Sequence, residues 1–182
     1  MSMNPIKLFR KNPEYLRSAV FGANDGLVTT FAVVAGASGA GLAPAVIIIL
    51  GGSNVLADGI SMALGDLLGE RSERKLDPQE AIEFPAWHTG AITFLFFFLA
   101  GLLPLLPYFW AVMCQECLVT SKPDNFTFSL ITTLLAMFII GSARSLVTRD
   151  SWLKNGLEML TVGAFAAMVA YFAGAWIEKL IL

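Results

Sequence analysis

The feature that most constrains this chain is an almost uncharged run over residues 18–69, whose only charged residues are Asp25, Asp58 and Asp66. A transmembrane helix needs about 20 mainly apolar residues, so this run is long enough for two of them. Residues 39–44, Gly-Ala-Gly-Leu-Ala-Pro, supply the turn between the two. Across the chain 56% of the residues are hydrophobic and 14% are charged, against roughly 25% charged residues in a soluble domain. The composition indicates that lipid is the solvent.

Three more apolar segments follow, and the sequence predicts an all-α integral membrane protein with five transmembrane helices. We expect one transmembrane domain over residues 1–182. The predicted spans lie approximately at residues 18–41, 44–69, 88–107, 125–145 and 156–178. The alternative for the first segment is a cleaved signal peptide, because basic residues precede it and small residues follow. A buried Asp25 and a second apolar span directly behind it argue against cleavage.

The loop charges predict the orientation of the five spans, because Lys and Arg are retained on the cytoplasmic side. Only two basic residues, Lys122 and Lys179, fall on one side of the membrane. The other side collects Lys7, Arg10, Lys11, Arg17, Arg71, Arg74, Lys75, Arg144, Arg149 and Lys154. We therefore predict a cytoplasmic N-terminus and a C-terminus outside.

The carboxylates within the spans are the strongest functional signal. An ionised carboxylate inside the bilayer costs at least ~2.5 kcal/mol, so one that is kept there usually faces a polar interior and has a function. Asp25 and Asp58 meet this description. The structural alternative is that each is a buried, hydrogen-bonded carboxylate that only holds helices together.

Helix geometry predicts the depth of these groups. Asp25 follows Arg17 by eight residues, and Met62 precedes Glu70 by eight residues. At 1.5 Å per residue, both lie about 12 Å inside the inner surface. Asp58 is then about 6 Å deeper than Met62.

A polar stripe is expected on the second span. Asn54, Asp58, Met62 and Asp66 recur at every fourth residue and so share one helix face. Asn24 and its neighbour Asp25 would join them from the first span. Carboxylates bind any hard divalent cation, whereas a thioether favours softer transition metals. The structural alternatives are core packing for Met62 and an interfacial position in contact with water for Asp66.

Small residues indicate close helix packing. Gly22 and Gly26 have the small-xxx-small spacing that lets two helices approach each other closely. The spacing fits either dimerisation or the packing of the first span against the second.

Two segments resemble a known family. Residues 21–29, FGANDGLVT, and residues 57–66, ADGISMALGD, resemble the paired signature of the vacuolar iron transporter family. The resemblance is close in the first two spans and looser in the fifth, where residues 163–174 are similar to the family's small-residue final helix.

This resemblance implies a five-helix fold with a cytosolic N-terminus and a homodimer whose pathway follows the two-fold axis. It implies movement of Fe²⁺, and often Mn²⁺, out of the cytosol in exchange for protons. The Asp of the first motif and the Met of the second line the family's pore, and they match Asp25 and Met62. The departure is the segment over residues 70–89. Iron-storing members carry a glutamate-rich cytosolic domain there, which this chain lacks.

Other candidates are weaker. Glu158, near the inner end of the fifth span, is a candidate proton-relay residue. His88 lies beside Trp87 at the expected inner interface, where aromatic residues are common, and a ligand role is its minor alternative. Cys114 and Cys117 have metal or redox spacing, but they lack a second ligand pair. A disulfide and a bystander role are both open for them.

We predict a transporter that exports divalent transition metals, Fe²⁺ or Mn²⁺, from the cytosol by proton antiport, with no cofactor and no nucleic-acid partner. A carboxyl group in a low-dielectric pore binds protons tightly and releases them to an arriving cation. The short inner loop favours a bacterial plasma membrane. The predicted metal ligands are Asp25, Met62 and Asp58, and the predicted pore-lining or proton-coupling residues are Asn24, Asn54, Asp66 and Glu158.

Three rival hypotheses remain. The first is a membrane scaffold or regulatory subunit that does not transport. The second is an intramembrane enzyme, which is disfavoured because no acid–base or nucleophilic set occurs at matched depth. The third is a transporter of organic cations or amines, against which the thioether of Met62 argues.

Overall fold

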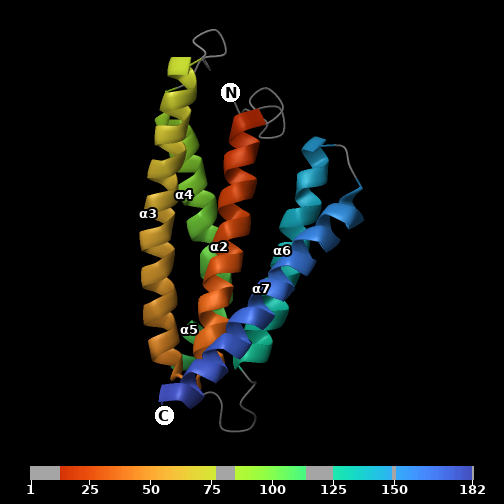
Figure 1. Ribbon diagram of the computed structural model, residues 1–182. Helices are drawn as coiled ribbons and strands as arrows, with labels where there is room; N and C mark the ends of the chain where they lie inside the picture. Colours follow the sequence, from red (N-terminus) through yellow and green to blue (C-terminus); the bar gives the residue numbers. More distant parts are fainter. Residues whose placement is uncertain (1–12, 77–84, 114–124, 149–150, 182) are drawn as a thin grey trace.

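The computed structural model describes residues 13–76, 85–113, 125–148 and 151–181 of the chain (Figure 1). Within these residues the structure is helical and contains no strand. The helices are α2 (Pro13–Gly39), α3 (Pro44–Leu76), α4 (Trp87–Leu102), the 3₁₀ helix η2 (Leu103–Leu105), α5 (Leu106–Met113), α6 (Asn125–Thr148) and α7 (Trp152–Ile181). Five segments are long and apolar enough to cross a membrane, with α4, η2 and α5 together forming the third. The predicted all-α class and the five spans are confirmed.

The turn between α2 and α3 follows from its sequence. Gly41 has φ +65°, the left-handed region that glycine adopts without strain. The N–H of Leu42 bonds the carbonyl of Ala37 at 3.0 Å, and the N–H of Gly41 bonds that of Ser38 at 3.1 Å. This pair of bonds is a Schellman motif. Pro44 then opens α3, where its missing N–H has no partner to lose.

The third span is interrupted rather than continuous. Pro104 and Pro107 cannot donate backbone hydrogen bonds, and the α-helix gives way to η2 between Leu103 and Leu105. The predicted span ended at residue 107, but helix α5 continues to Met113.

Helices α2, α3 and α4 pack through glycines. A Cβ at Gly22 would lie 2.5 Å from the carbonyl oxygen of Thr93, and one at Gly26 would collide with the carbonyl of Phe97. A Cβ at Gly90 would collide with the carbonyl of α3 residue Ala63. The predicted close approach at Gly22 and Gly26 therefore occurs, but its partner is α4 of the same chain rather than the second span or a second subunit.

Helices α6 and α7 form an antiparallel pair that touches α2 mainly near the end of α2. Gly36 and Gly174 are in close contact there, and Gly39 meets Tyr171. Figure 1 shows the pair diverging from α2 toward the other end, where α2 begins.

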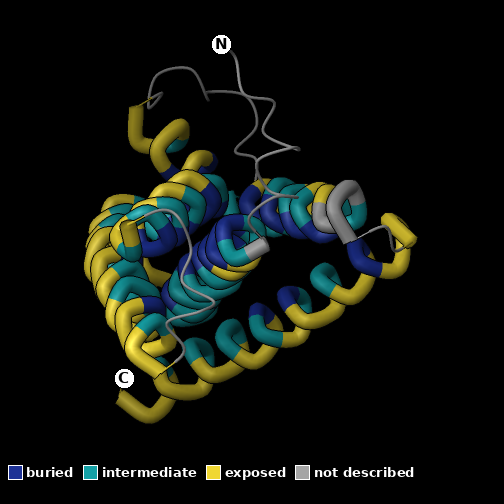
Figure 2. Tube along the Cα trace, turned by 90° about the horizontal axis from the view of Figure 1, so that it is seen from above, coloured by how far each residue is buried: buried dark blue, intermediate teal, exposed yellow. Residues whose placement is uncertain are grey.

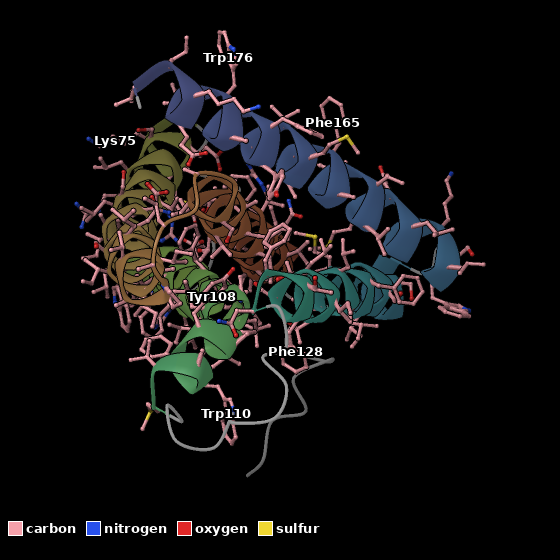
Figure 3. The ribbon with its side chains drawn as sticks, turned by 90° about the horizontal axis from the view of Figure 1, so that it is seen from below. Lys75, Tyr108, Trp110, Phe128, Phe165 and Trp176 are labelled. Carbon is pink, nitrogen blue, oxygen red and sulfur yellow. The ribbon has the colours of Figure 1, made fainter. Side chains whose placement is uncertain are left out.

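Buried residues gather where helices face one another, and exposed residues lie on the outer faces (Figure 2). Many of the exposed residues are large and apolar. Phe165 and Trp176 project outward from α7 (Figure 3) and are 68% and 66% exposed. Tyr108 turns inward instead and shares a 2.8 Å hydrogen bond with Ser38. Large exposed apolar side chains over the length of the helices are what a lipid environment requires.

Candidate functional site

Helix α4 contacts both α2 and α3, so these contacts show which residues of α2 and α3 lie at the same height along the bundle. Gly26 of α2 lies against the backbone of Phe97, and Gly59 of α3 lies against the ring of the same residue. The two glycines are therefore at one height. Each directly follows a predicted metal ligand, Asp25 or Asp58. The two aspartates are half-buried and close enough for their charges to repel each other.

Met62 and Asp66 follow Asp58 at successive turns of α3. They lie toward the N-terminal end of the bundle, where α2 begins and α3 ends. Asp66 is tied to both neighbouring helices. Its Oδ2 accepts a 2.8 Å hydrogen bond from Ser18 of α2 and a 2.7 Å bond from Thr93 of α4.

The heights differ from the sequence-based depths by about one helical turn, ~5 Å. Asp25 is level with Asp58, and Met62 lies one turn nearer the N-terminal end. The prediction treated Arg17 and Glu70 as level. Ser18, the residue after Arg17, instead donates a hydrogen bond to Asp66, which precedes Glu70 by one helical turn. Charged residues mark the membrane surface only to within a turn, because helices continue beyond it.

A cavity of about 720 Å³, here called the vestibule, opens at the N-terminal end of the bundle. Met62 is its deepest residue on α3, and Asp25 and Asp58 lie beyond it. Four carboxylates and two guanidinium groups face it. Its lining is Glu14, Arg17, Ser18, Phe21, Met62, Gly65, Asp66, Gly69, Glu70, Glu73, Arg74, Leu76 and Thr89.

Some polar groups near the vestibule are paired with one another. Glu70 is buried and pairs with Arg74 one turn later, at 2.8 Å. His88 lies 3.5 Å from the hydroxyl of Tyr15 through Nδ1, and its ring is 4.1 Å from that of Trp87. These contacts favour the interfacial interpretation of His88 over a ligand role.

Polar atoms also occur beyond the two aspartates. A Cβ at Gly101 of α4 would lie 3.0 Å from both Thr30 and Val55, which therefore share one height. Thr30 Oγ1 and the Nδ2 of Asn54, the residue before Val55, are buried without a hydrogen-bond partner in the described part of the chain. Asn54 was predicted to line the pathway. Thr30 was missed, although a threonine within an apolar segment was a visible signal.

The remaining predicted residues have different surroundings. Asn24 is half-buried beside Asp25. Glu158 is exposed on α7, outside the vestibule lining. The structure therefore does not bring it together with the aspartates. Cys114 and Cys117 lie outside the described residues.

The described residues of one chain supply only part of a metal ligand set. Over residues 13–76, 85–113, 125–148 and 151–181, no group of three or more His, Cys, Asp or Glu residues is arranged to hold an ion. Asp25, Asp58 and Met62 together offer two carboxylates and one thioether.

Comparisons with known proteins show that the sequence is similar to one family. A family model described as the VIT family matches residues 16–83 and 71–175. Vacuolar iron transporter 1 of Eucalyptus grandis is 25% identical, over 87% of this chain and 84% of the relative. The vacuolar iron transporter of Plasmodium berghei is 24% identical, over 91% of this chain and 83% of its own length. That of Toxoplasma gondii is 43% identical over 34% of this chain and 20% of its own.

Proposed function

Because this chain belongs to the VIT family, we propose that it is a transporter that moves Fe²⁺ or Mn²⁺ out of the cytosol. The observation that carries the proposal is the pair Asp25 and Asp58 at one height, reached from the vestibule past Asp66 and Met62. Carboxylate oxygens replace the water of a divalent cation, and the thioether favours a transition metal over Mg²⁺ or Ca²⁺.

Proton antiport follows from the same pair. Two nearby carboxylates in a low-dielectric environment do not both stay ionised without a neutralising charge. No Lys or Arg occurs over residues 18–69 to supply one. We therefore propose that an arriving divalent cation displaces a proton from the pair and so couples metal movement to proton movement.

A homodimer would complete the site. A two-fold axis beside α3 doubles two carboxylates and one thioether into a full ligand set. The outward face of α3 supports this placement because small, exposed residues recur on it at every fourth position. They are Ser53, Ala57, Ser61, Gly65 and Gly69. Small residues allow close helix approach in a membrane.

Uptake into proteoliposomes tests the proposal. We expect Fe²⁺, Mn²⁺ and Co²⁺ to be transported faster than Mg²⁺ or Ca²⁺, with protons moving the opposite way. With the membrane potential clamped, a gradient of about two pH units should speed metal flux. Flux indifferent to that gradient would indicate a uniporter, and no flux of any divalent cation would favour a scaffold.

We further propose that the membrane is a bacterial plasma membrane, because the connection over residues 70–89 is short. Fractionation of the source cells tests this location. Recovery with an internal compartment would contradict it.

A further inference from the structure

We propose that Asp66 is the first cation ligand on the pathway, and that Ser18 and Thr93 are positioning residues that hold its carboxylate toward the vestibule. The inference rests on the proposed function and extends it. It assigns the ligand that takes up a partly hydrated divalent cation before the aspartate pair does.

The hydroxyls of Ser18 and Thr93 have an unusual hydrogen-bond partner. A Ser or Thr in a helix ordinarily bonds a carbonyl of its own helix about one turn earlier. Ser72 and Thr132 do this here, with Leu68 and Phe128 respectively. Ser18 and Thr93 instead reach across to a third helix.

The two residues that donate hydrogen bonds to Asp66 are buried. Ser18 is 5% exposed and Thr93 is fully buried. The close contact between Gly22 and the backbone of Thr93 fixes α4 against α2 at this height. The donors are therefore held in place by helix packing, and their positions do not depend on the carboxylate.

The two oxygens of the Asp66 carboxylate differ in their hydrogen bonding within the described residues. Both hydroxyls donate to Oδ2 of Asp66. Oδ1 has no hydrogen-bond or ion-pair partner among the described residues, and the side chain lines the vestibule. An anionic oxygen facing a cavity of about 720 Å³ is a site for a hydrated divalent cation.

Anchoring also prevents a competing ion pair. Arg17, next to Ser18 in sequence, faces the same vestibule, as does Arg74. Arg74 is already paired with Glu70. Without its two hydroxyl donors, the Asp66 carboxylate could rotate toward Arg17 and lose its availability to a cation. One carboxylate oxygen binds weakly enough to pass the ion on to Met62, as conduction requires.

The decisive experiment compares two substitutions of Thr93, measured as Mn²⁺ uptake into proteoliposomes. Thr93→Val keeps the shape and removes the hydroxyl, whereas Thr93→Ser keeps the hydroxyl and removes a methyl group. We expect Thr93→Val to raise the KM for Mn²⁺ about fivefold, the factor for one hydrogen bond, with little change in maximal rate. Thr93→Ser should keep the normal KM. A packing role would give the reverse order.

Ser18→Ala provides an independent variant should Thr93→Val fail to assemble, and it should also raise KM about fivefold. Matched controls are Ser72→Ala and Thr132→Val, whose hydroxyls bond their own helices. In an Asp66→Asn background, neither Ser18→Ala nor Thr93→Val should raise KM further.

The outcomes separate the two proposals. If the unmodified protein moves no divalent cation, the proposed function fails. If it transports normally and KM is unchanged in both Ser18→Ala and Thr93→Val, only the present inference is overturned.

Discussion

At the scale of single residues, the closeness of Asp25 and Asp58 distinguishes a ligand pair from a structural one. A carboxylate kept for structure accepts hydrogen bonds, and its removal leaves buried donors unpaired. Two carboxylates at one height repel each other instead. Removing a structural carboxylate should therefore lower the folding stability, whereas removing one carboxylate of a repelling pair should raise it.

Replacing one carboxyl group of the pair with an amide should stabilise the metal-free protein, because the pair then no longer has to take up a proton or hold two like charges. The same change should abolish function. We expect Asp58→Asn, like Asp25→Asn, to raise the thermal unfolding temperature in detergent without metal. Transport of every divalent cation should fall at least about 100-fold, because a buried charge partner is lost. Lys179→Gln, which removes a charge at an exposed position of α7 outside the vestibule lining, is the control. A lower unfolding temperature in both aspartate variants would show that the carboxylates are structural.

Met62 should determine which metal is preferred rather than whether transport occurs. Met62→Leu conserves volume and apolarity, so it should lower stability by less than about 1.5 kcal/mol. Without the sulfur, the preference for Fe²⁺ or Co²⁺ over Mg²⁺ should fall, measured by competition in uptake assays. Met62 also packs against the core. Unchanged selectivity in Met62→Leu would assign it to packing and leave Asp25 and Asp58 as the site.

The sequence was enough to locate the residues whose burial in a membrane has a high desolvation cost. It was not enough to locate those that position another residue through a hydrogen bond. Asp25 and Asp58 could be singled out because a carboxylate in lipid has a large desolvation cost. Ser18 and Thr93 carry no such signal, since a hydroxyl in a helix is usually satisfied by its own backbone. Only the packing of three helices shows that both bond Asp66.

At the scale of helices, hydrophobicity predicted the spans better than their ends. Helix α3 continues past residue 69 to Leu76 because a helix leaving the membrane keeps its backbone bonds in water. The interruption at Pro104 was readable from the sequence, since proline cannot donate to the helix ladder. The partner of Gly22 and Gly26 was not readable, because the small-residue spacing does not specify which helix approaches.

Helix packing at Gly26 should be sensitive to a single methyl group. In Gly26→Ala the new Cβ would collide with the backbone carbonyl of Phe97, which cannot move away as a side chain can. We expect a loss of about 1–3 kcal/mol, seen as a lower unfolding temperature in detergent.

Gly52→Ala is the matched control, because nothing lies within 4 Å of a Cβ at that position. It should raise stability slightly, as Ala is the better helix former by up to about 1 kcal/mol. Equal effects at Gly26 and Gly52 would contradict the close approach of α2 and α4.

At the scale of the whole molecule, the distribution of basic residues predicts the orientation in the membrane. In a background with Cys114 and Cys117 replaced, a cysteine beside Lys122 should react with an impermeant thiol reagent added outside intact cells. One beside Arg74 should react only after the membrane is opened. The reverse pattern would place the vestibule outside and turn export into import.

We also predict a homodimer whose two-fold axis lies beside α3. The outward face of α3 carries small exposed residues beside the stripe of Asp58, Met62 and Asp66, so a second copy at this face would bring two pathways together. In the cysteine-replaced background, Ser61→Cys should form a disulfide-linked dimer on mild oxidation, since facing α carbons would come within about 7 Å.

Phe165→Cys on α7 supplies the comparison for this experiment. Its side chain is 68% exposed, and α7 is the least buried of the five spans. Cross-linking at Ser61 but not at Phe165 would put the axis beside α3 and complete the ligand set with two copies of Asp25 and Asp58. Cross-linking at Phe165 alone would place the interface on α7, far from the aspartates. Each chain would then need a metal pathway of its own.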